Sequence, residues 1–374
     1  MLSSKFFHEQ LTKHNIDFYT GVPDSLLKDF CAYIMDNVEK NKHIIAVNEG
    51  CAVALACGYH LATKKIPLVY MQNSGLGNAT NPLLSLADKQ VYSIPLLLLI
   101  GWRGESGVKD EPQHISQGEV TPDLLKSMKI PYIVLDKNED NAAKQLGNLF
   151  ESIAQENAPY AIIVQKETFF PYQLKNLITD NSFLSREEAI KNVIQYITEN
   201  DVVVSTTGMI SRELYELREQ CSQGHFQDFL TVGSMGHASQ IALGIALNKP
   251  NNKIYCLDGD GAMLMHLGGL ATVATCIPNN YIHIIFNNGA HDSVGGQPTI
   301  AHDINIQSLA YSLGYKEVGK AKSTDDISKF LTNIDKFPAL LEICVMKGAR
   351  INLGRPKSTP VANKIEFMNF LSGL

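Results

Sequence analysis

The chain has 374 residues, of which 45% are hydrophobic and 19% are charged, and its formal net charge is −6. This length is too great for one ordinary domain and suits two, and the composition is typical of a folded globular chain and excludes extended disorder. The negative charge disfavours nucleic acid or an anionic membrane as the main partner.

The N-terminus and the cysteines predict the cellular location. The first ten residues lack the apolar core and small-residue cleavage site of a secretory signal. The apolar run at 94–100 is far too short to cross a membrane and suits a buried parallel strand. Seven cysteines without a Cys-x-x-Cys pair fit reduced thiols. We therefore expect a cytoplasmic protein that binds neither nucleic acid nor a membrane.

Short β-branched runs alternate with amphipathic stretches in the first half of the chain. Strands are predicted at 18–22, 43–47, 67–72, 94–101, 132–135 and 160–165. Helices are predicted at 24–37, 50–63, 78–87, 122–128 and 138–156. Such alternation is typical of a mostly parallel sheet that has helices on both faces. We therefore expect an α/β domain over residues 1–168.

The alternation lapses at 169–185, where we place a linker between domains. Ser185-Arg-Glu-Glu188 has the pattern of a capping box that opens a new helix. Further strands are predicted at 202–206, 229–232, 253–258, 281–287 and 340–345. The predicted fold class is therefore α/β, with two tandem domains of similar build, the second over residues 186–374.

Two motifs at strand ends predict a metal and diphosphate site in the second domain. One strand ends in Gly259-Asp260-Gly261, and the next strand runs into Asn287-Asn288. If these strands are parallel neighbours, the carboxylate and the amides lie side by side at one edge of the sheet. Carboxylate and amide oxygens suit Mg²⁺, and the glycines let the backbone approach a diphosphate closely. A βα turn in which Gly and Asn only cap a helix is the plain alternative, and the spacing of the pair disfavours it.

This pair of motifs is similar to the signature of thiamine-diphosphate-dependent enzymes. The resemblance implies that thiamine diphosphate and Mg²⁺ are the cofactors. It also implies that the metal ligands are Asp260, Asn288 and the main-chain carbonyl of Ala290.

Two more segments resemble parts of the same family. Thr206-Thr-Gly-Met209 matches the turn that contacts the diphosphate, and Gly233-Ser-Met-Gly236 matches the segment that holds the aminopyrimidine. There Met235 would support the bent conformation of the cofactor, although most methionines only fill a core. The cofactor-binding residues that the resemblance implies are Thr207, Gly208, Gly233, Met235, Gly259, Gly261 and Ala262.

Glu49 is the candidate activating residue in the first domain. Thiamine chemistry needs a carboxylate that keeps a proton on the pyrimidine ring of the cofactor. Glu49 follows a predicted strand and opens an Ala/Gly-rich helix, which resembles the position of the catalytic glutamate in this family. A glutamate at this place is commonly only a helix cap, but the metal motif favours the catalytic role. In this family the two halves meet on one cofactor at a subunit interface, which implies a homodimer or homotetramer.

Three segments at strand ends could line a substrate pocket, at 21–25, 101–114 and 289–298. Asp24 and His114 resemble the acid/base residues of thiamine-dependent 2-oxoacid decarboxylases, and the plain alternatives are a helix cap and a solvated loop residue. Further candidate substrate contacts are Ser25, Arg103 and His291. The basic residues that could bind an anionic head group are Arg103, Lys109, Arg350 and Arg355.

Residues 287–299, the segment 110–114 and the two-domain length resemble the phosphonopyruvate decarboxylase family and the related sulfopyruvate decarboxylases. The resemblance implies that a small anionic 2-oxoacid, phosphonopyruvate, is decarboxylated to phosphonoacetaldehyde and CO₂. Sulfopyruvate decarboxylase, or another thiamine-dependent 2-oxoacid decarboxylase or synthase, is the alternative. A module that only binds a Mg²⁺-nucleotide is disfavoured for two reasons. Gly75-Leu-Gly77 lacks the third glycine of a dinucleotide motif, and a nucleotide-binding module would have no use for Glu49.

Overall fold

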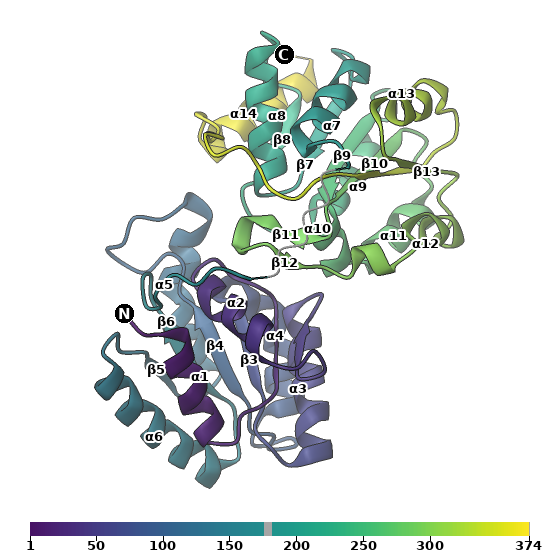
Figure 1. The fold of residues 1–374 in the computed structure, drawn as a ribbon. Helices are drawn as coiled ribbons and strands as arrows, with labels where there is room; N and C mark the ends of the chain where they lie inside the picture. Colours follow the sequence, from purple (N-terminus) through teal and green to yellow (C-terminus); the bar gives the residue numbers. More distant parts are fainter. Residues whose placement is uncertain (176–181, 374) are drawn as a thin grey trace. The chain divides into compact units, whose positions relative to one another are not determined.

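The computed structural model describes residues 1–175 and 182–373. The chain divides into two compact units, Met1–Leu177 and Ile178–Leu374 (Figure 1). Each unit is built on one six-stranded sheet, and all the strand pairings of both sheets are parallel. In the part of the chain that the structure describes, no helix combines the length and the apolar character needed to cross a membrane.

The sheet of the first unit is buried on both faces. Its strands follow one another in space as β2 (His43–Ile45), β1 (Tyr19–Gly21), β3 (Leu68–Gln72), β4 (Leu97–Gly101), β6 (Tyr160–Val164) and β5 (Tyr132–Val134). The helices are α1 (Ser4–Lys13), α2 (Lys28–Asn37), α3 (Glu49–Thr63), α4 (Leu76–Pro82), α5 (Pro112–Ser127) and α6 (Glu139–Glu156). Successive residues of a strand point to opposite faces, so Tyr70 packs with α1, α2 and α6, while Val69 packs with α3 and α4.

The second unit has a similar plan. Its strands follow one another as β13 (Glu317–Ala321), β14 (Ala339–Cys344), β10 (Tyr281–Asn287), β9 (Ile254–Gly259), β7 (Val202–Ser205) and β8 (Asp228–Leu230). The helices are α7 (Arg186–Val193), α8 (Met209–Gln220), α9 (Ala238–Asn248), α10 (Asp260–Met265), α11 (Gly268–Cys276), α12 (Ile306–Leu313), α13 (Thr324–Asn333) and α14 (Pro360–Ser372). A short hairpin, β11 (Ala290–His291) and β12 (Gln297–Pro298), follows β10.

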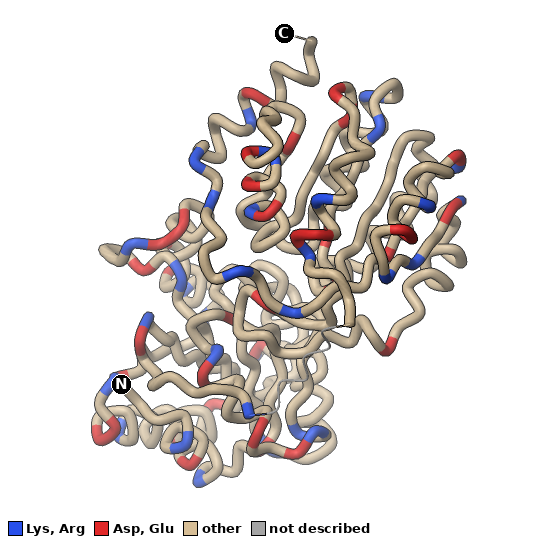
Figure 2. Tube along the Cα trace, turned by 45° about the horizontal axis from the view of Figure 1, so that its top comes forward, with Lys and Arg blue, Asp and Glu red and all other residues tan. Residues whose placement is uncertain are grey.

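One face of the second sheet is apolar and packs with α7, α8 and α13. The other face, where α9 packs on β7, β9 and β10, carries the polar side chains of Asp258, His283 and Glu342. Figure 2 shows that Lys and Arg are interspersed with Asp and Glu along the helices and loops of both units. Asp258, His283 and Glu342 differ from these residues because they are buried within the sheet.

The predicted α/β fold with two tandem domains is confirmed, and a strand lies at each predicted position. The predicted capping box is also confirmed, since the Ser185 side chain accepts from the backbone of Glu188 and the Glu188 side chain accepts in return. Phe169 packs in the core of the first unit, and Leu184 bridges to Val345 in the second. Between them, 176–181 of the predicted linker lie outside the described residues.

Some elements differ from the sequence prediction. Helix α1 and the edge strand β13 were not predicted, and the helix predicted at 122–128 begins ten residues earlier, at Pro112. Proline is favoured at the first helical position, but Gly118 and Pro122 inside α5 weaken the helical pattern. His114 does not lie in a loop, as its plain alternative assumed, but in the first turn of α5, where it is half-buried.

Candidate functional site

Asp24 lies just after β1, at the edge where the carboxyl ends of β1, β3 and β4 are neighbours. Its carboxyl is fully buried and accepts hydrogen bonds from Gln72 Nε2 at 2.7 Å and from the backbone N–H of Leu26 at 2.8 Å. A Cβ at Gly101 would lie 2.2 Å from Asp24 Oδ2. The roles of Gln72 and of glycine at 101 were not predicted, because both depend on contacts between strands that are distant in sequence.

Arg103 is held in a fixed orientation at the same edge. Its Nε donates to Asp110 Oδ2 at 2.8 Å, and its Nη2 donates to the other oxygen of that carboxylate. Its Nη1 donates to Ser25 Oγ at 2.8 Å, and the backbone N–H of Gly104 also donates to Asp110. The structure therefore brings together the predicted residues Ser25 and Arg103, and it adds Asp110 as the counter-charge of the guanidinium.

Burial shifts the two candidate acid/base residues in opposite directions. Burial raises the pKa of Asp24, although the hydrogen bonds from Gln72 and Leu26 oppose the shift. Burial lowers the pKa of His114 to about 4, the positive charge of Arg103 lowers it further, and Asp110 opposes both. At neutral pH His114 is therefore uncharged, whereas Asp24 keeps a proton more readily than an ordinary aspartate.

Glu49 is the first residue of α3, and its side chain is only 5% exposed. Asn48 caps this helix, because its side chain accepts from the backbone N–H of Cys51 at 2.8 Å. Glu49 Oε2 accepts from Asn78 Nδ2 at 2.8 Å, and a Cβ at Gly75 would lie 2.5 Å from Oε1. Because Asn48 already caps this helix, the structure disfavours the helix-cap alternative for Glu49. The absence of a side chain at Gly75 leaves room for the Glu49 carboxylate, and this role was not predicted from the sequence.

In the second unit, β9 and β10 are parallel neighbours in which Gly259 pairs with Phe286. Asp260 and Asn287 therefore leave the sheet at the same edge. Asp260 is 3% exposed, and it accepts a hydrogen bond from Thr299 Oγ1. Burial raises the pKa of Asp260 to about 6, although the hydrogen bond from Thr299 opposes the shift. Among the described residues no cationic side chain pairs with Asp260, and a cation is favourable beside such a buried carboxylate.

The two asparagines have different environments. Asn287 Nδ2 donates to Glu342 at 2.7 Å and its Oδ1 accepts from the backbone of Gly289, so its amide is used within the protein. Asn288 Nδ2 donates to Asp292 Oδ2 at 2.6 Å, and its Oδ1 accepts from the backbone N–H of Ala290 at 3.0 Å. Because a carboxylate only accepts hydrogen bonds, Asp292 fixes which end of the Asn288 amide faces it. One lone pair of Asn288 Oδ1 is then left for a ligand.

Arg186 supports this arrangement and was not singled out from the sequence. Its side chain is 5% exposed and forms a two-point pair with Glu213 at 2.8 and 2.9 Å. Its Nη1 also donates to Asp292 Oδ2 at 3.1 Å, and the backbone N–H of Gly348 donates to the same oxygen at 2.9 Å. A buried ion network therefore holds the carboxylate that orients Asn288.

The remaining candidates of the second unit follow strand ends. Thr207, Gly208, Gly233 and Met235 lie in turns or bends, Gly261 and Ala262 lie in α10, and His291 lies in β11. Thr207 Oγ1 donates to the carbonyl of Val232 at 2.8 Å, and Gly208 has a φ of +95°, which favours glycine. A Cβ at Gly261 would lie 3.0 Å from His291 Cε1 and 3.4 Å from Met235 Cε, so these three residues are neighbours. Burial lowers the pKa of His291 to about 4.

Several features of this edge fit a divalent cation and a diphosphate. Asp260 and Asn288 offer the hard oxygen ligands that Mg²⁺ prefers. Among the described residues, Thr206 Oγ1 and both polar atoms of the Gln297 amide are buried without a hydrogen-bond partner. Such groups are available to a bound ligand.

The basic residues predicted to bind the anionic head group of the substrate lie in different environments. Arg350 pairs with Glu187 at 3.0 Å and also contacts Glu216, so its charge is balanced within the second unit. Lys109 is exposed. Arg103 is the basic residue that lies in one hydrogen-bonded group with another predicted substrate contact, Ser25.

Comparisons with known proteins agree with these two halves. The sequence model for the N-terminal TPP binding domain of thiamine pyrophosphate enzymes matches residues 2–127, and that for the C-terminal TPP binding domain matches residues 206–343. Phosphonopyruvate decarboxylase of Streptomyces viridochromogenes is 32% identical over 97% of this chain and 93% of its own length. That of Streptomyces hygroscopicus is 33% identical over 96% and 92%, respectively. Sulfopyruvate decarboxylase of Methanosarcina acetivorans is 26% identical over 90% and 88%.

Replacing Asp24→Asn should remove a pH-dependent loss of stability. Because folding raises the pKa of Asp24 above its ordinary value of 3.8, its contribution to stability is full below that pH and is lost as the pH rises through the raised pKa. The free energy of unfolding of the wild type should therefore fall relative to that of the variant from about pH 4 upward. Urea unfolding followed by the fluorescence of Trp102, the single tryptophan, measures this difference. If the free energies of unfolding of the wild type and the variant change in parallel between about pH 4 and pH 7, the prediction is wrong.

Proposed function

Because the chain belongs to the phosphonopyruvate decarboxylase family of thiamine pyrophosphate enzymes, we propose that it decarboxylates phosphonopyruvate to phosphonoacetaldehyde and CO₂. The observation that carries this proposal is the identity of 32% and 33% to two phosphonopyruvate decarboxylases over nearly the full length of both. The lower identity of 26% to a sulfopyruvate decarboxylase makes that activity the second candidate.

Mg²⁺ and thiamine diphosphate are the proposed cofactors. Asp260, Asn288 and the main-chain carbonyl of Ala290 would hold the metal, supported by the buried carboxylate of Asp260 and by the fixed amide of Asn288. The bound cofactor supplies an electron sink for the electron pair that CO₂ leaves behind. The residues proposed to contact its diphosphate and rings are Thr207, Gly208, Gly233, Met235, Gly259, Gly261 and Ala262.

Glu49 is the proposed activating residue. Its carboxylate would hold a proton at the pyrimidine ring nitrogen, which makes the exocyclic amino group basic. The hydrogen bond from Asn78 and the close packing of Gly75 support this role, because they hold the two carboxylate oxygens in place. Burial also keeps water from competing for the proton.

Asp24 is the proposed proton donor to the carbon that CO₂ leaves. The raised pKa of Asp24 suits an acid, whereas the pKa of His114, lowered to about 4, makes the imidazole an acceptor at neutral pH. Ser25, Arg103 and, from the second unit, His291 are the proposed substrate contacts. Asp110 would then act as a positioning residue that aims the guanidinium of Arg103 toward Ser25 and the anionic head group.

The purified chain with thiamine diphosphate and Mg²⁺ should release aldehyde from phosphonopyruvate. We expect kcat/KM for phosphonopyruvate to exceed that for sulfopyruvate and for pyruvate by about tenfold or more, which is about 1.4 kcal/mol of transition-state binding. A coupled aldehyde assay with the three acids side by side measures the ratio. Equal or faster turnover of sulfopyruvate would replace the first candidate with the second.

Replacing Glu49→Gln should slow exchange of the C2 proton of the bound cofactor by about a hundredfold or more, because the amide cannot share the proton on the pyrimidine ring. Proton NMR of the cofactor after incubation in deuterated water and an acid quench measures the rate. Calorimetry should show that thiamine diphosphate still binds. Exchange at the wild-type rate would remove Glu49 from this role.

Two glycines offer a matched control for the position of Glu49. Gly75→Ala should slow the same exchange, because the new Cβ would lie 2.5 Å from Glu49 Oε1. Gly77→Ala should leave it unchanged, since nothing lies within 4 Å of a Cβ there. Equal rates in the two variants would mean that the packing of Gly75 does not hold the carboxylate.

The proposal includes a homodimer or homotetramer in which Glu49 of one copy and Asp260 of another serve one cofactor. Glu49→Gln and Asp260→Asn chains, each inactive, should then regain about a quarter of the wild-type activity after joint unfolding and refolding, because half of the dimers are mixed and each mixed dimer has one intact site. Each variant refolded alone is the control. Absence of any gain in a mixture shown to contain hybrids would contradict a shared site.

A further inference from the structure

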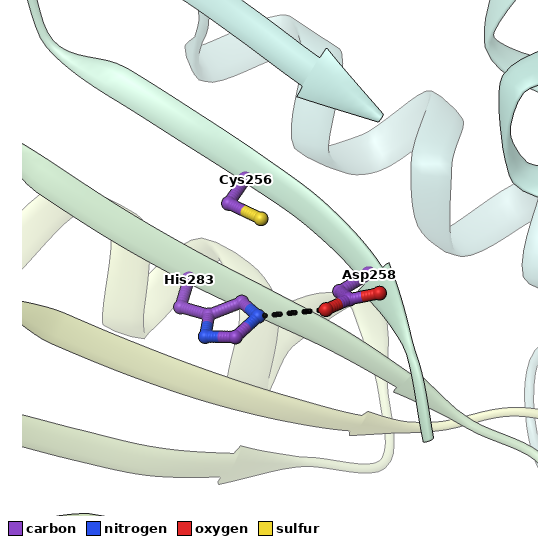
Figure 3. A group of neighbouring side chains, drawn as sticks. All are labelled: Cys256, Asp258 and His283. Carbon is purple, nitrogen blue, oxygen red and sulfur yellow. Dashed lines mark hydrogen bonds and ion pairs between the residues drawn. The ribbon is translucent and has the colours of Figure 1, made fainter. Parts of the chain in front are cut away.

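A second group of metal-ligating side chains lies within the sheet of the second unit, apart from the residues proposed to bind Mg²⁺. Cys256 and Asp258 come from β9 and His283 comes from the neighbouring strand β10 (Figure 3). One sulfur, one carboxylate oxygen and one ring nitrogen of these residues all lie within 4.8 Å of one another. The three residues are 0%, 1% and 0% exposed, respectively.

The register of the sheet brings these side chains together. Cys256 pairs with His283 across β9 and β10, and Asp258 is two residues further along β9, so all three side chains project from the same face. His283 Nε2 lies 3.3 Å from Asp258 Oδ2 (Figure 3). Among the described residues its other nitrogen, Nδ1, has no hydrogen-bond partner. The single polar contact of the ring is therefore the one it makes inside the group.

A charged strand residue on this face normally has several partners. Glu342 of β14 accepts from Asn287, Gln307 and Lys320, which together satisfy its carboxylate. Among the described residues, the partners of Asp258 are the His283 ring and the backbone N–H of Gly259, at 2.9 Å. A buried thiol, imidazole and carboxylate placed together are costly to desolvate unless something binds all three.

We propose that Cys256, Asp258 and His283 bind a divalent transition metal ion, with Zn²⁺ as the first candidate. Sulfur and imidazole ligands exclude Mg²⁺ and favour Zn²⁺ over the hard cations. A thiolate and a carboxylate cancel the two charges of the ion, so the complex with a neutral imidazole is neutral and suits a buried site. Ligands on a tetrahedral Zn²⁺ lie about 3.5 Å apart, and the separation of 3.3 Å between His283 Nε2 and Asp258 Oδ2 fits this value.

Tyr315 is the nearby polar residue that could complete the site. Its hydroxyl is buried and has no partner among the described residues. Burial raises the pKa of Tyr315 well above its ordinary value, and the charges of Cys256 and Asp258 raise it further. Tyr281 interacts with the side chain of Cys256 and also donates to the carbonyl of Ser239 at 3.2 Å. Three protein ligands leave one position open on a tetrahedral ion.

Metal binding would be coupled to loss of the Cys256 thiol proton. Burial raises the pKa of the Cys256 thiol well above its ordinary value, so the metal-free group keeps its proton. The S–H bond breaks as the sulfur–metal bond forms, and the proton leaves to solvent. The bound ion would join β9 and β10 just before the ends that carry Asp260 and Asn287, and would thereby stabilise the edge of the sheet.

Metal analysis of the purified full-length chain tests the proposal. Inductively coupled plasma mass spectrometry should find about one zinc per chain after growth with zinc and dialysis without chelator. Asp260→Asn should keep this zinc, because it alters only the proposed Mg²⁺ site. Cys256→Ser should lose it, whereas Cys344→Ser, at a buried cysteine on the neighbouring strand β14, should keep it. Absence of stoichiometric zinc in the wild type, or its retention in Cys256→Ser, would overturn the proposal.

Cobalt substitution gives a readout that does not depend on catalysis. Co²⁺ added to the metal-free chain should produce a thiolate-to-metal charge-transfer band in the wild type, in Cys344→Ser and in Asp260→Asn, and no such band in Cys256→Ser. His283→Gln should keep the band but need at least about tenfold more Co²⁺, and it serves if Cys256→Ser does not fold by circular dichroism. A wild-type chain without the band, or a His283→Gln titration identical to that of the wild type, would contradict the site. Neither result depends on whether the chain decarboxylates phosphonopyruvate.

Discussion

Parallel pairing of β9 with β10 is the constraint on which the candidate site of the second unit depends. The pairing of Gly259 with Phe286 sends both strands out of the sheet at one edge, where Asp260 and the two asparagines follow. A shift of one residue would turn the side chains of one strand to the opposite face of the sheet. The same pairing places Cys256 against His283, so one register determines both proposed metal sites.

The first unit uses the same geometry for a different purpose. The ends of β1, β3 and β4 converge on Asp24, and glycine at 101 leaves the space that its carboxyl fills. Burial there favours neutral forms, so it raises the pKa of Asp24 and lowers that of His114. One environment therefore shifts the pKa values of these two groups in opposite directions. Glu49, held by Asn78 at the start of α3, forms a second and separate group of this unit.

Much of this could be predicted from the sequence. The buried strands were predictable because parallel strands are continuous apolar runs, and Asp260 and Asn288 because two polar motifs follow such runs. Helix α5 was predicted too short, because Gly118 and Pro122 weaken the local pattern that packing overrides. Asp292, Arg186 and Gln72 were not predictable, since each acts on a residue through contacts between separate elements. Such contacts leave no periodicity in the sequence.

We propose a division of labour in which the second unit holds the cofactor and the first unit activates it. Calorimetric titration of the metal-free chain with thiamine diphosphate, with and without Mg²⁺, tests this division most directly. The wild type and Glu49→Gln should bind with similar Kd and only when Mg²⁺ is present. Asp260→Asn should bind more than about tenfold more weakly, a loss of about 1.4 kcal/mol or more. Wild-type affinity in Asp260→Asn, or binding that does not depend on Mg²⁺, would contradict it.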